Sequence, residues 1–211
     1  MKALLINGSP HKNGSTTTAL RLVADALEEE GVGAEIYQIS PAPVRGCAGC
    51  FRCKNSGTNR CFFDDDEVNG LIEKIEGSDA LILGTPVYFA GPNGQLTSVL
   101  DRVFFAGRAS FAGKPGAAVC VLRRGGATAT LDTLQKYFNI SGMPIAPSTY
   151  WPMAHGMSGD EIKKDTEGVQ TMEMLGKTIA WLVKCINAGK AVDVVYPEMP
   201  GGEKIATNFI R

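Results

Sequence analysis

The sequence has no excess of either charge, and this absence argues against one large class of partners. Lysine and arginine together number 21, against 22 aspartates and glutamates, so the formal net charge is −1. Proteins that grip nucleic-acid phosphates usually carry a clear basic excess. Internal repeats and low-complexity segments are also missing from the sequence. We therefore expect neither a nucleic-acid partner nor a repeat architecture.

Long apolar runs are missing as well. No run approaches the roughly 20 residues that a membrane-spanning helix needs. The apolar start of the chain is interrupted by Asn7, Gly8 and Ser9, too early for a secretory signal peptide. We therefore expect a cytoplasmic protein with no membrane partner. In a reducing compartment, clustered cysteines more often bind metal or do redox chemistry than form structural disulfides.

What the sequence does contain is a regular alternation of short apolar runs and helical patterns. Strands are expected at residues 2–7, 33–40, 79–88, 114–126 (with its turn) and 142–150, and helices at 15–30, 64–77, 91–107, 127–139 and 160–188. This alternation predicts an α/β fold: a flavodoxin-like, doubly wound, five-stranded parallel sheet in the order 2-1-3-4-5. The domain would span residues 1–188, with a cysteine-rich loop (46–66) inserted after strand 2. A C-terminal tail (189–211) could contact another subunit.

The segment "NGSPHKNGSTT", residues 7–17, follows the first strand and opens the first helix. N–H groups at a helix start can bind an anion, and small residues let the backbone approach a phosphate. Its polar side chains are Ser9, His11, Lys12, Asn13, Ser15, Thr16 and Thr17. Because it has neither a Walker A ending nor a G-x-G-x-x-G pattern, it favours flavin mononucleotide (FMN) over the ligands of those motifs. An ordinary turn before a well-capped helix is the alternative.

Two further loops are expected beside this segment, because ligands of doubly wound sheets bind at the carboxyl ends of the strands. In "GTPVYFAGPNG", after strand 3, Pro86 stiffens the loop while Tyr88 and Phe89 offer aromatic faces. In "LRRGGATAT", after strand 4, Gly125 and Gly126 let the backbone approach a flat ligand. Both loops suit an isoalloxazine ring, although core packing would also explain the two aromatic residues.

Four of the six cysteines lie close together, at Cys47, Cys50, Cys53 and Cys61. The spacing C-x2-C-x2-C-x7-C lets one loop offer three thiolates to one face of a cubane and a fourth to close it, and bacterial ferredoxins use the same opening. Zinc, a redox disulfide and free thiols without metal stay open as alternatives. Cys120 and Cys185 are expected to be inert core residues. The acidic residues 64–66 are expected to cap a helix rather than bind a metal.

These loops and the cysteine segment resemble the NADPH-dependent FMN reductase family, and the compact cysteine motif resembles its iron–sulfur flavoproteins. The resemblance covers roughly residues 1–185. It implies FMN with its phosphate near Ser9, His11, Asn13, Ser15, Thr16 and Thr17. It implies that the ring lies near Pro86, Val87, Tyr88, Phe89, Gly125 and Gly126. It also supports a [4Fe–4S] cluster on Cys47, Cys50, Cys53 and Cys61.

Two positions depart from the family pattern. Relatives often carry arginine at position 11, and His11 would bind phosphate less firmly near neutral pH. They also often carry lysine where Thr97 stands.

Together these features predict an FMN-dependent oxidoreductase in which the cofactor does the chemistry and no side chain serves as a catalytic acid or base. Electrons would come from NAD(P)H or ferredoxin and reach a quinone, a flavin or another small acceptor, with the cluster as a candidate relay. The alternatives are an electron carrier or redox sensor with little turnover, and a binding domain without cofactor.

A homodimer or homotetramer is expected, because a flavin at the edge of one sheet is open to solvent on one side and relatives cover it with neighbouring subunits. Apolar residues at 151–160 and in the tail, with Tyr196, Met199 and Phe209, are candidates for such contacts. Packing on their own domain is the alternative.

Overall fold

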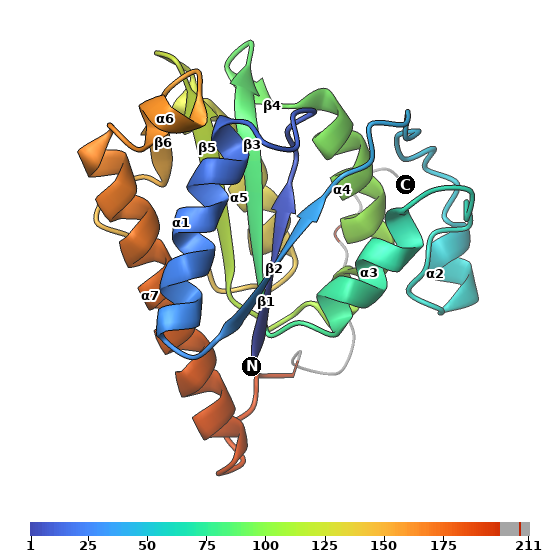
Figure 1. Ribbon diagram of the computed structural model, residues 1–211. Coiled ribbons are helices and arrows are strands. Elements are labelled where there is room, and N and C mark those ends of the chain that lie inside the picture. Colours follow the sequence, from blue (N-terminus) through green and yellow to red (C-terminus); the bar gives the residue numbers. More distant parts are fainter. Residues whose placement is uncertain (199–206, 208–211) are drawn as a thin grey trace.

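The computed structural model describes residues 1–198 and 207, and its centre is a parallel β-sheet (Figure 1). The strands of this sheet are β1 (Lys2–Asn7), β2 (Gly33–Gln38), β3 (Ala80–Tyr88), β5 (Gly116–Leu122) and β6 (Met153–His155). They pair in the order β2-β1-β3-β5-β6. Counting parallel strands alone, this is the predicted flavodoxin-like order 2-1-3-4-5, which is confirmed.

Helices cover both faces of the sheet (Figure 1). One face packs against α1 (Ser15–Glu29) and α7 (Thr166–Lys190), and the other against α3 (Val68–Glu76), α4 (Gly94–Gly107) and α5 (Ala127–Ile140). In β1, Leu4 and Ile6 face the second group, while Ala3 and Leu5 face the first. A strand buried on both faces needs apolar residues at every position, and this explains the continuous apolar runs in the sequence.

Short elements complete the fold: α2 (Arg52–Ser56), β4 (Gly91–Pro92), a 3-10 turn (Arg108–Ser110) and α6 (Gly159–Ile162). β4 pairs antiparallel with the end of β3. Since β4 occupies residues 91–92, α4 begins later than predicted, where the Asn93 side chain accepts from the N–H groups of Gln95 and Leu96 at 2.9 and 3.3 Å. Among the described residues, none of the helices has the length and apolar character to cross a bilayer.

The fifth strand was predicted at the wrong place. Residues 142–150 form only an isolated bridge between Ile145 and Gly116, and the strand β6 follows at Met153–His155. Pro144 and Pro147 interrupt the predicted stretch, and Pro152 follows shortly after it. Proline has no N–H to donate to a neighbouring strand, so regular pairing begins only after the last of the three.

The final helix, predicted at 160–188, is two helices. α6 ends at Ile162, and Asp165 starts α7 by accepting from the Gly168 N–H at 3.0 Å. α7 then continues to Lys190, past the predicted boundary between domain and tail. Of the residues expected to make subunit contacts, Met199 and Phe209 lie outside the described residues.

Candidate functional site

The predicted ligand loops meet at the carboxyl edge of the sheet, where β1, β3 and β5 end. The loop after β1 is joined to β3, because the Gly8 N–H donates to the Gly84 carbonyl at 2.8 Å. A Cβ added at Gly8 would lie only 2.6 Å from Cδ2 of Leu96 in α4. The first loop, β3 and the start of α4 therefore pack without room for a side chain at this point.

Asn7, at the end of β1, organises the loop that follows it. Its buried amide donates to Oγ1 of Thr17 at 2.9 Å and to Oε1 of Gln38 at 2.7 Å. Its Oδ1 accepts from the Ser9 N–H at 3.0 Å, and Gln38 donates to the Ser9 carbonyl at 2.7 Å. The Thr17 hydroxyl donates in turn to the Lys12 carbonyl at 2.6 Å. Since this hydroxyl donor is already used, Thr17 can offer an incoming anion only its backbone N–H.

The remaining predicted phosphate residues surround the start of α1. Thr16 is buried, Ser15 is half-buried, and His11 and Asn13 are exposed. Within the described part of the chain, no side chain accepts a hydrogen bond from this helix N-terminus. The N-cap residue is Gly14, which has no side chain to cap the helix. The N–H groups of the first turn are left for solvent or a ligand.

β3 ends in a two-residue hairpin turn with an exposed tip. Tyr88 pairs with Gly91 of β4, which leaves Phe89 and Ala90 as the turn, with φ angles of 51° and 59°. Positive φ at both positions is the type I′ geometry, which favours Gly, Asn or Asp over larger residues. Phe89 is fully exposed and Tyr88 is 43% exposed, so the alternative that this pair packs in the core is wrong.

The loop after β5 touches this hairpin. Gly126 has a φ of 97°, and a Cβ added there would lie 2.7 Å from Cα of Ala90 and 3.0 Å from Cγ1 of Val87. Only glycine permits this approach. The fold therefore gathers the predicted ring-side residues in one region: Pro86, Val87, Tyr88, Phe89, Gly125 and Gly126.

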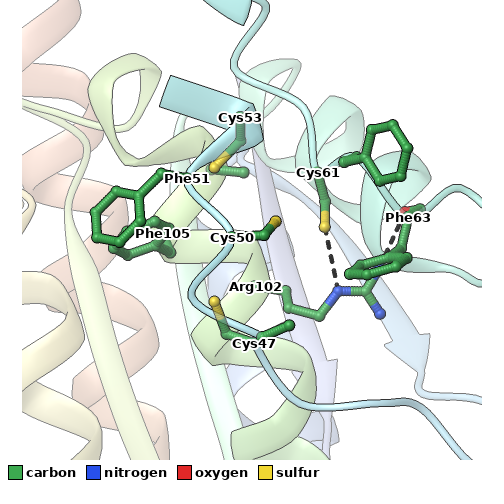
Figure 2. Close-up of a pocket in the computed structure, with 11 residues that line it drawn as sticks. Cys47, Cys50, Phe51, Cys53, Cys61, Phe63, Arg102 and Phe105 are labelled. Carbon is green, nitrogen blue, oxygen red and sulfur yellow. Dashed lines mark hydrogen bonds between the residues drawn. The ribbon is translucent and has the colours of Figure 1, made fainter. Parts of the chain in front are cut away.

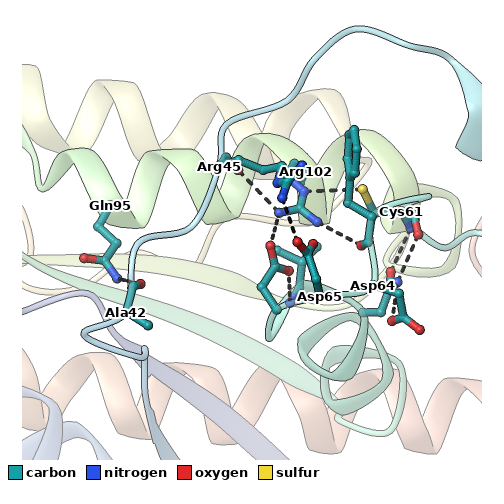
Figure 3. A network of polar contacts seen from close by, with 11 residues as sticks. Ala42, Arg45, Cys61, Asp64, Asp65, Gln95 and Arg102 are labelled. Atoms are coloured by element: carbon teal, nitrogen blue, oxygen red, sulfur yellow. Dashed lines mark hydrogen bonds and ion pairs between the residues drawn. The ribbon is translucent and has the colours of Figure 1, made fainter.

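The cysteine segment (residues 46–66) leaves the fold after β2, as predicted, and returns at α3. Its flanks are held together, because the Ser40 N–H donates to both carboxylate oxygens of Glu67 at 2.9 and 3.0 Å. Gln95 of α4 donates to the carbonyls of Ser40 and Ala42, the latter at 2.9 Å (Figure 3). The segment is thus attached by its two ends to the same part of the fold.

All four clustered cysteines line one small pocket on α4 (Figure 2). All carry free thiols; two are exposed and two half-buried. Aromatic rings supply much of the remaining wall, and the rings of Phe51 and Phe105 meet edge to face with centroids 5.6 Å apart. The pocket encloses about 20 Å³, roughly the space of one water molecule.

The donor set of this pocket is chemically that of a thiolate-bound metal cluster. Within residues 1–198 and 207, no three His, Cys, Asp or Glu side chains stand in metal-ligating positions. Four thiols with apolar walls nevertheless match the chemistry of an iron–sulfur site. Burial raises the pKa of the Cys53 thiol, so metal binding at this residue would release a proton.

Arg102 of α4 closes the pocket from the inside and is 1% exposed. Its Nε donates to Sγ of Cys61 at 3.3 Å. Its other nitrogens donate to the carbonyls of Arg45 and Phe63 at 3.4 and 3.0 Å and to the Asp66 carboxylate (Figure 3). Burial alone would lower the pKa of Arg102, but the hydrogen bonds to Asp66 and Cys61 outweigh burial and raise the pKa. The guanidinium is therefore charged.

Sequence reasoning missed two residues that shape these sites. Arg102 falls beside Val99 and Val103 on the buried stripe of α4, and a charged residue in such a stripe signals a buried partner. Asn7 ends an otherwise apolar buried strand, where a polar side chain must also find partners. In both cases the sequence shows a polar residue at a buried position, but it does not show which residue forms the hydrogen bond.

The acidic residues 64–66 serve the cysteine segment more than the helix that follows. Asp66 alone of the three accepts from a backbone N–H of α3, that of Val68 at 3.1 Å, whereas Asp64 accepts from the Asn69 side chain at 3.0 Å. Asp65 pairs instead with the exposed Arg45, with 2.6 Å between nitrogen and oxygen. The predicted capping role is therefore confirmed for one residue of the three.

The two remaining cysteines differ from each other. Cys120 is fully buried in β5, and burial raises its pKa to about 12, so it is the inert core residue that was predicted. The same prediction is wrong for Cys185, which is exposed. Cys185 comes two positions after Val183, the last buried residue of α7, and so faces away from the sheet.

Comparison with known proteins places the chain in a family. Residues 1–158 match the family model described as NADPH-dependent FMN reductase. The chain is 34% identical over 199 residues to an iron–sulfur flavoprotein of Methanocaldococcus jannaschii, an alignment that covers 88% of this chain and 99% of that protein.

Solved structures agree on the fold. RosB with bound 8-demethyl-8-formylriboflavin-5′-phosphate superposes with a TM-score of 0.71 at 16% identity, covering 99% of this chain and 92% of RosB. The flavodoxin, WrbA-like protein of Agrobacterium tumefaciens gives a TM-score of 0.59 at 19% identity, covering 87% and 97%. With its loops, sheet order and family match in agreement, the chain belongs to the NADPH-dependent FMN reductase family.

Proposed function

We propose that this protein is an FMN-dependent oxidoreductase that takes electrons from NAD(P)H or ferredoxin and passes them to a quinone, a flavin or another small acceptor. The observation that carries the proposal is the convergence of three ligand-type loops at the carboxyl edge of the sheet, through the contacts of Gly8 with Gly84 and of Gly126 with Ala90. Family membership supports the flavin. Bound FMN would supply one- and two-electron chemistry.

The phosphate would be held at the start of α1. The free N–H groups of the first helical turn support this assignment, since they offer donors and the positive end of the helix dipole. The exposed His11 and Asn13 lie at the open side of the loop. The proposed phosphate residues are Ser9, His11, Asn13, Ser15, Thr16 and Thr17, the last through its N–H alone.

The ring would lie against the hairpin and the loop after β5, which contact each other at Gly126 and Ala90. Support comes from the exposed aromatic faces of Tyr88 and Phe89 and from Gly125, where a Cβ would meet no described atom within 4 Å, while Gly126 holds the loop against the hairpin. Pro86 and Val87 are half-buried at the base of the hairpin and would fix the position of its tip relative to the ring. The chain's own residues thus bind and orient the cofactor, and none is assigned as an acid or base.

We further propose that Cys47, Cys50, Cys53 and Cys61 bind a [4Fe–4S] cluster. Their shared pocket, its apolar walls and the charged guanidinium beside Cys61 support this, together with the name of the M. jannaschii relative. A cluster at this point would supply one-electron transfer. Zinc and free thiols are the other outcomes that a metal analysis distinguishes.

Anaerobically purified protein tests both cofactors at once through its visible spectrum and its FMN, iron, sulfide and zinc contents. We expect one FMN and one cluster per chain. Cys61→Ser should lose iron and keep FMN, whereas Cys185→Ser, the matched change at an exposed cysteine outside the pocket, should keep both. A colourless protein that takes up no FMN refutes the flavin. A protein with FMN but no iron refutes the cluster.

An electron carrier with little turnover is the second candidate function, and the electron donor decides between the two. We expect steady-state turnover with NAD(P)H and a quinone. Fast reduction by ferredoxin with negligible NAD(P)H turnover would instead favour the carrier.

We also propose a homodimer or homotetramer. Tyr150 and Trp151 are about half-exposed, at 51% and 53%, and Met157 is 73% exposed. Such apolar exposure supports a subunit contact. Sedimentation velocity of the holoprotein measures the subunit number, and a monomer at micromolar concentration would refute this assembly.

A further inference from the structure

Arg102 donates three hydrogen bonds to the cysteine segment and one to Arg45, the residue just before it. Its guanidinium reaches a sulfur, a carboxylate and two backbone carbonyls, and Figure 3 shows these contacts converging from both arms of the segment. Arg45 precedes the first cysteine, while Cys61, Phe63 and Asp66 follow the third. One side chain of the core helix α4 therefore ties together the two arms of the segment.

The charge of Arg102 is as well defined as its position. The side chain is 1% exposed, and its partner Asp66 is 13% exposed. Counter-ions screen buried charges much less than exposed ones, so salt in solution weakens the effect of these two charges on the pocket only a little. The guanidinium donates directly to Sγ of Cys61, at 3.3 Å. Asp66 differs, because its oxygens accept from Arg102 and from the Val68 N–H, and among the described residues no hydrogen bond joins them to a sulfur.

We propose that Arg102 is a positioning and tuning residue of the cysteine site: it holds Cys61 against α4, and its fixed positive charge raises the reduction potential of the cluster, while Asp66 partly offsets that charge. The inference rests on the proposed cluster. Reduction adds one electron, from an external reductant, and takes the core from the 2+ to the 1+ state. The added negative charge is stabilised by a nearby cation and by a hydrogen bond to sulfur, both known determinants of cluster potential.

Three variants separate charge from geometry. Arg102→Gln removes the charge, Arg102→Lys keeps it without the planar set of donors, and Asp66→Asn removes the offsetting carboxylate while Arg102 stays. The exposed ion pair of Arg45 and Asp65, with side chains 51% and 60% exposed, offers the same two chemical changes as controls. These are Arg45→Gln and Asp65→Asn.

The readout is the midpoint potential of the cluster in an anaerobic dithionite titration followed by electron paramagnetic resonance. At the wild-type midpoint, Arg102→Gln should lower the ratio of reduced to oxidised cluster about tenfold or more, which is 59 mV or more for a one-electron couple. Asp66→Asn should shift the potential in the opposite direction, and Arg102→Lys should stay near the wild type. The two control variants should change the ratio less than twofold. Shifts of the same sign at Arg102 and Asp66, or equal shifts in the controls, refute the tuning role.

Amide hydrogen exchange tests the positioning role without any cluster. In iron-free protein, Arg102→Gln and Arg102→Lys should both speed exchange of the Cys61 N–H, which donates to Oδ1 of Asn69 at 2.7 Å, while Arg45→Gln should not. Unchanged exchange refutes the positioning role. If the anaerobically purified wild type contains no iron, the cluster and the tuning role are both refuted. The hydrogen-exchange test of the positioning role can still be carried out. Should Arg102→Gln fail to fold, Asp66→Asn and Arg102→Lys still decide both points.

Discussion

Replacing Gly126 by alanine is expected to damage the proposed flavin site, because two independent penalties act at this position. Its φ of 97° lies in the region that costs a residue with a Cβ about 1–2 kcal/mol. The new methyl group would lie 2.7 Å from Cα of Ala90, and forced overpacking typically costs about 1–3 kcal/mol. A backbone atom cannot rotate away as a side-chain end can, so this contact is relieved only if the whole hairpin that carries Tyr88 and Phe89 moves.

The two penalties sum to about 2–5 kcal/mol. If the hairpin stays, the loss appears in stability, and at about 2–4 °C per kcal/mol the melting temperature should fall by about 4–20 °C. If the hairpin moves, FMN affinity should fall instead, by about tenfold for each 1.4 kcal/mol. Thermal unfolding of the FMN-free protein and FMN titration by fluorescence quenching measure the two terms separately.

Gly125 is the matched control. It lies next to Gly126 in the same loop, but within the described residues a Cβ added there would meet no atom within 4 Å. Gly125→Ala should therefore keep the melting temperature within about 2 °C of the wild type, since open surface changes stay within about 0.5 kcal/mol. The reasoning fails if Gly126→Ala matches the wild type in both assays, or if Gly125→Ala lowers the melting temperature of the FMN-free protein as much as Gly126→Ala does.

Three further predictions concern the frame around the sites. Asn7→Ala should lower the free energy of unfolding by about 1–3 kcal/mol, because it leaves buried partners unsatisfied; urea unfolding measures this, and a change below 0.5 kcal/mol would contradict it. The hydrogen bond from Arg60 is the main cause that lowers the pKa of Glu76 below 4.5, so this pair stabilises the fold above that pH and its contribution is lost as the pH falls through the lowered pKa. The stability difference between wild type and Glu76→Gln should therefore shrink between pH 6 and pH 3, and a constant difference would disprove the coupling. Gly176→Ala should destabilise the protein despite a helix-propensity gain of about 1 kcal/mol, because the methyl group would lie 2.6 Å from the Val23 carbonyl oxygen; a higher urea midpoint than the wild type would reverse this conclusion.

The parts of the fold that could be predicted are those where one local signal acts alone. The strands at β1, β3 and β5 are apolar at nearly every position, and burial between two helix layers admits no other pattern. The region before β6 was misassigned because the apolar residues around Ile145 resemble a strand. The three prolines prevent pairing only where their missing N–H groups would have faced a neighbouring strand, and the sequence does not show which strand that is. The break in the last helix depends on Asp165, which caps α7 through a local contact. In the sequence, however, Asp165 cannot be told from any other acidic residue of a helix.

The site shows the same division. Residue types and their order predicted which loops approach one another, because strand ends of a parallel sheet meet at one edge. Contacts between residues far apart in the sequence could not be predicted. Arg102 hydrogen-bonds Cys61, 41 positions away, and Asn7 hydrogen-bonds Gln38, 31 positions away. The hairpin turn was hidden for a different reason, since Phe89 and Ala90 are residues that the type I′ turn rarely selects.

The contact between Ser40 and Glu67 has a consequence for how such proteins diversify. Ser40 and Glu67 lie on either side of residues 41–66 and are hydrogen-bonded to each other. A short turn could therefore join them without moving β2 or α3. By loop-closure entropy, cutting some 26 intervening residues to about four would favour folding by roughly 1.7 kcal/mol. The cysteine segment could therefore be removed or replaced while the sheet stays in place. To move the cysteine site to another flavodoxin-like protein, the smallest set of residues to graft would be 41–66 together with Gln95 and Arg102, which hold the segment on α4.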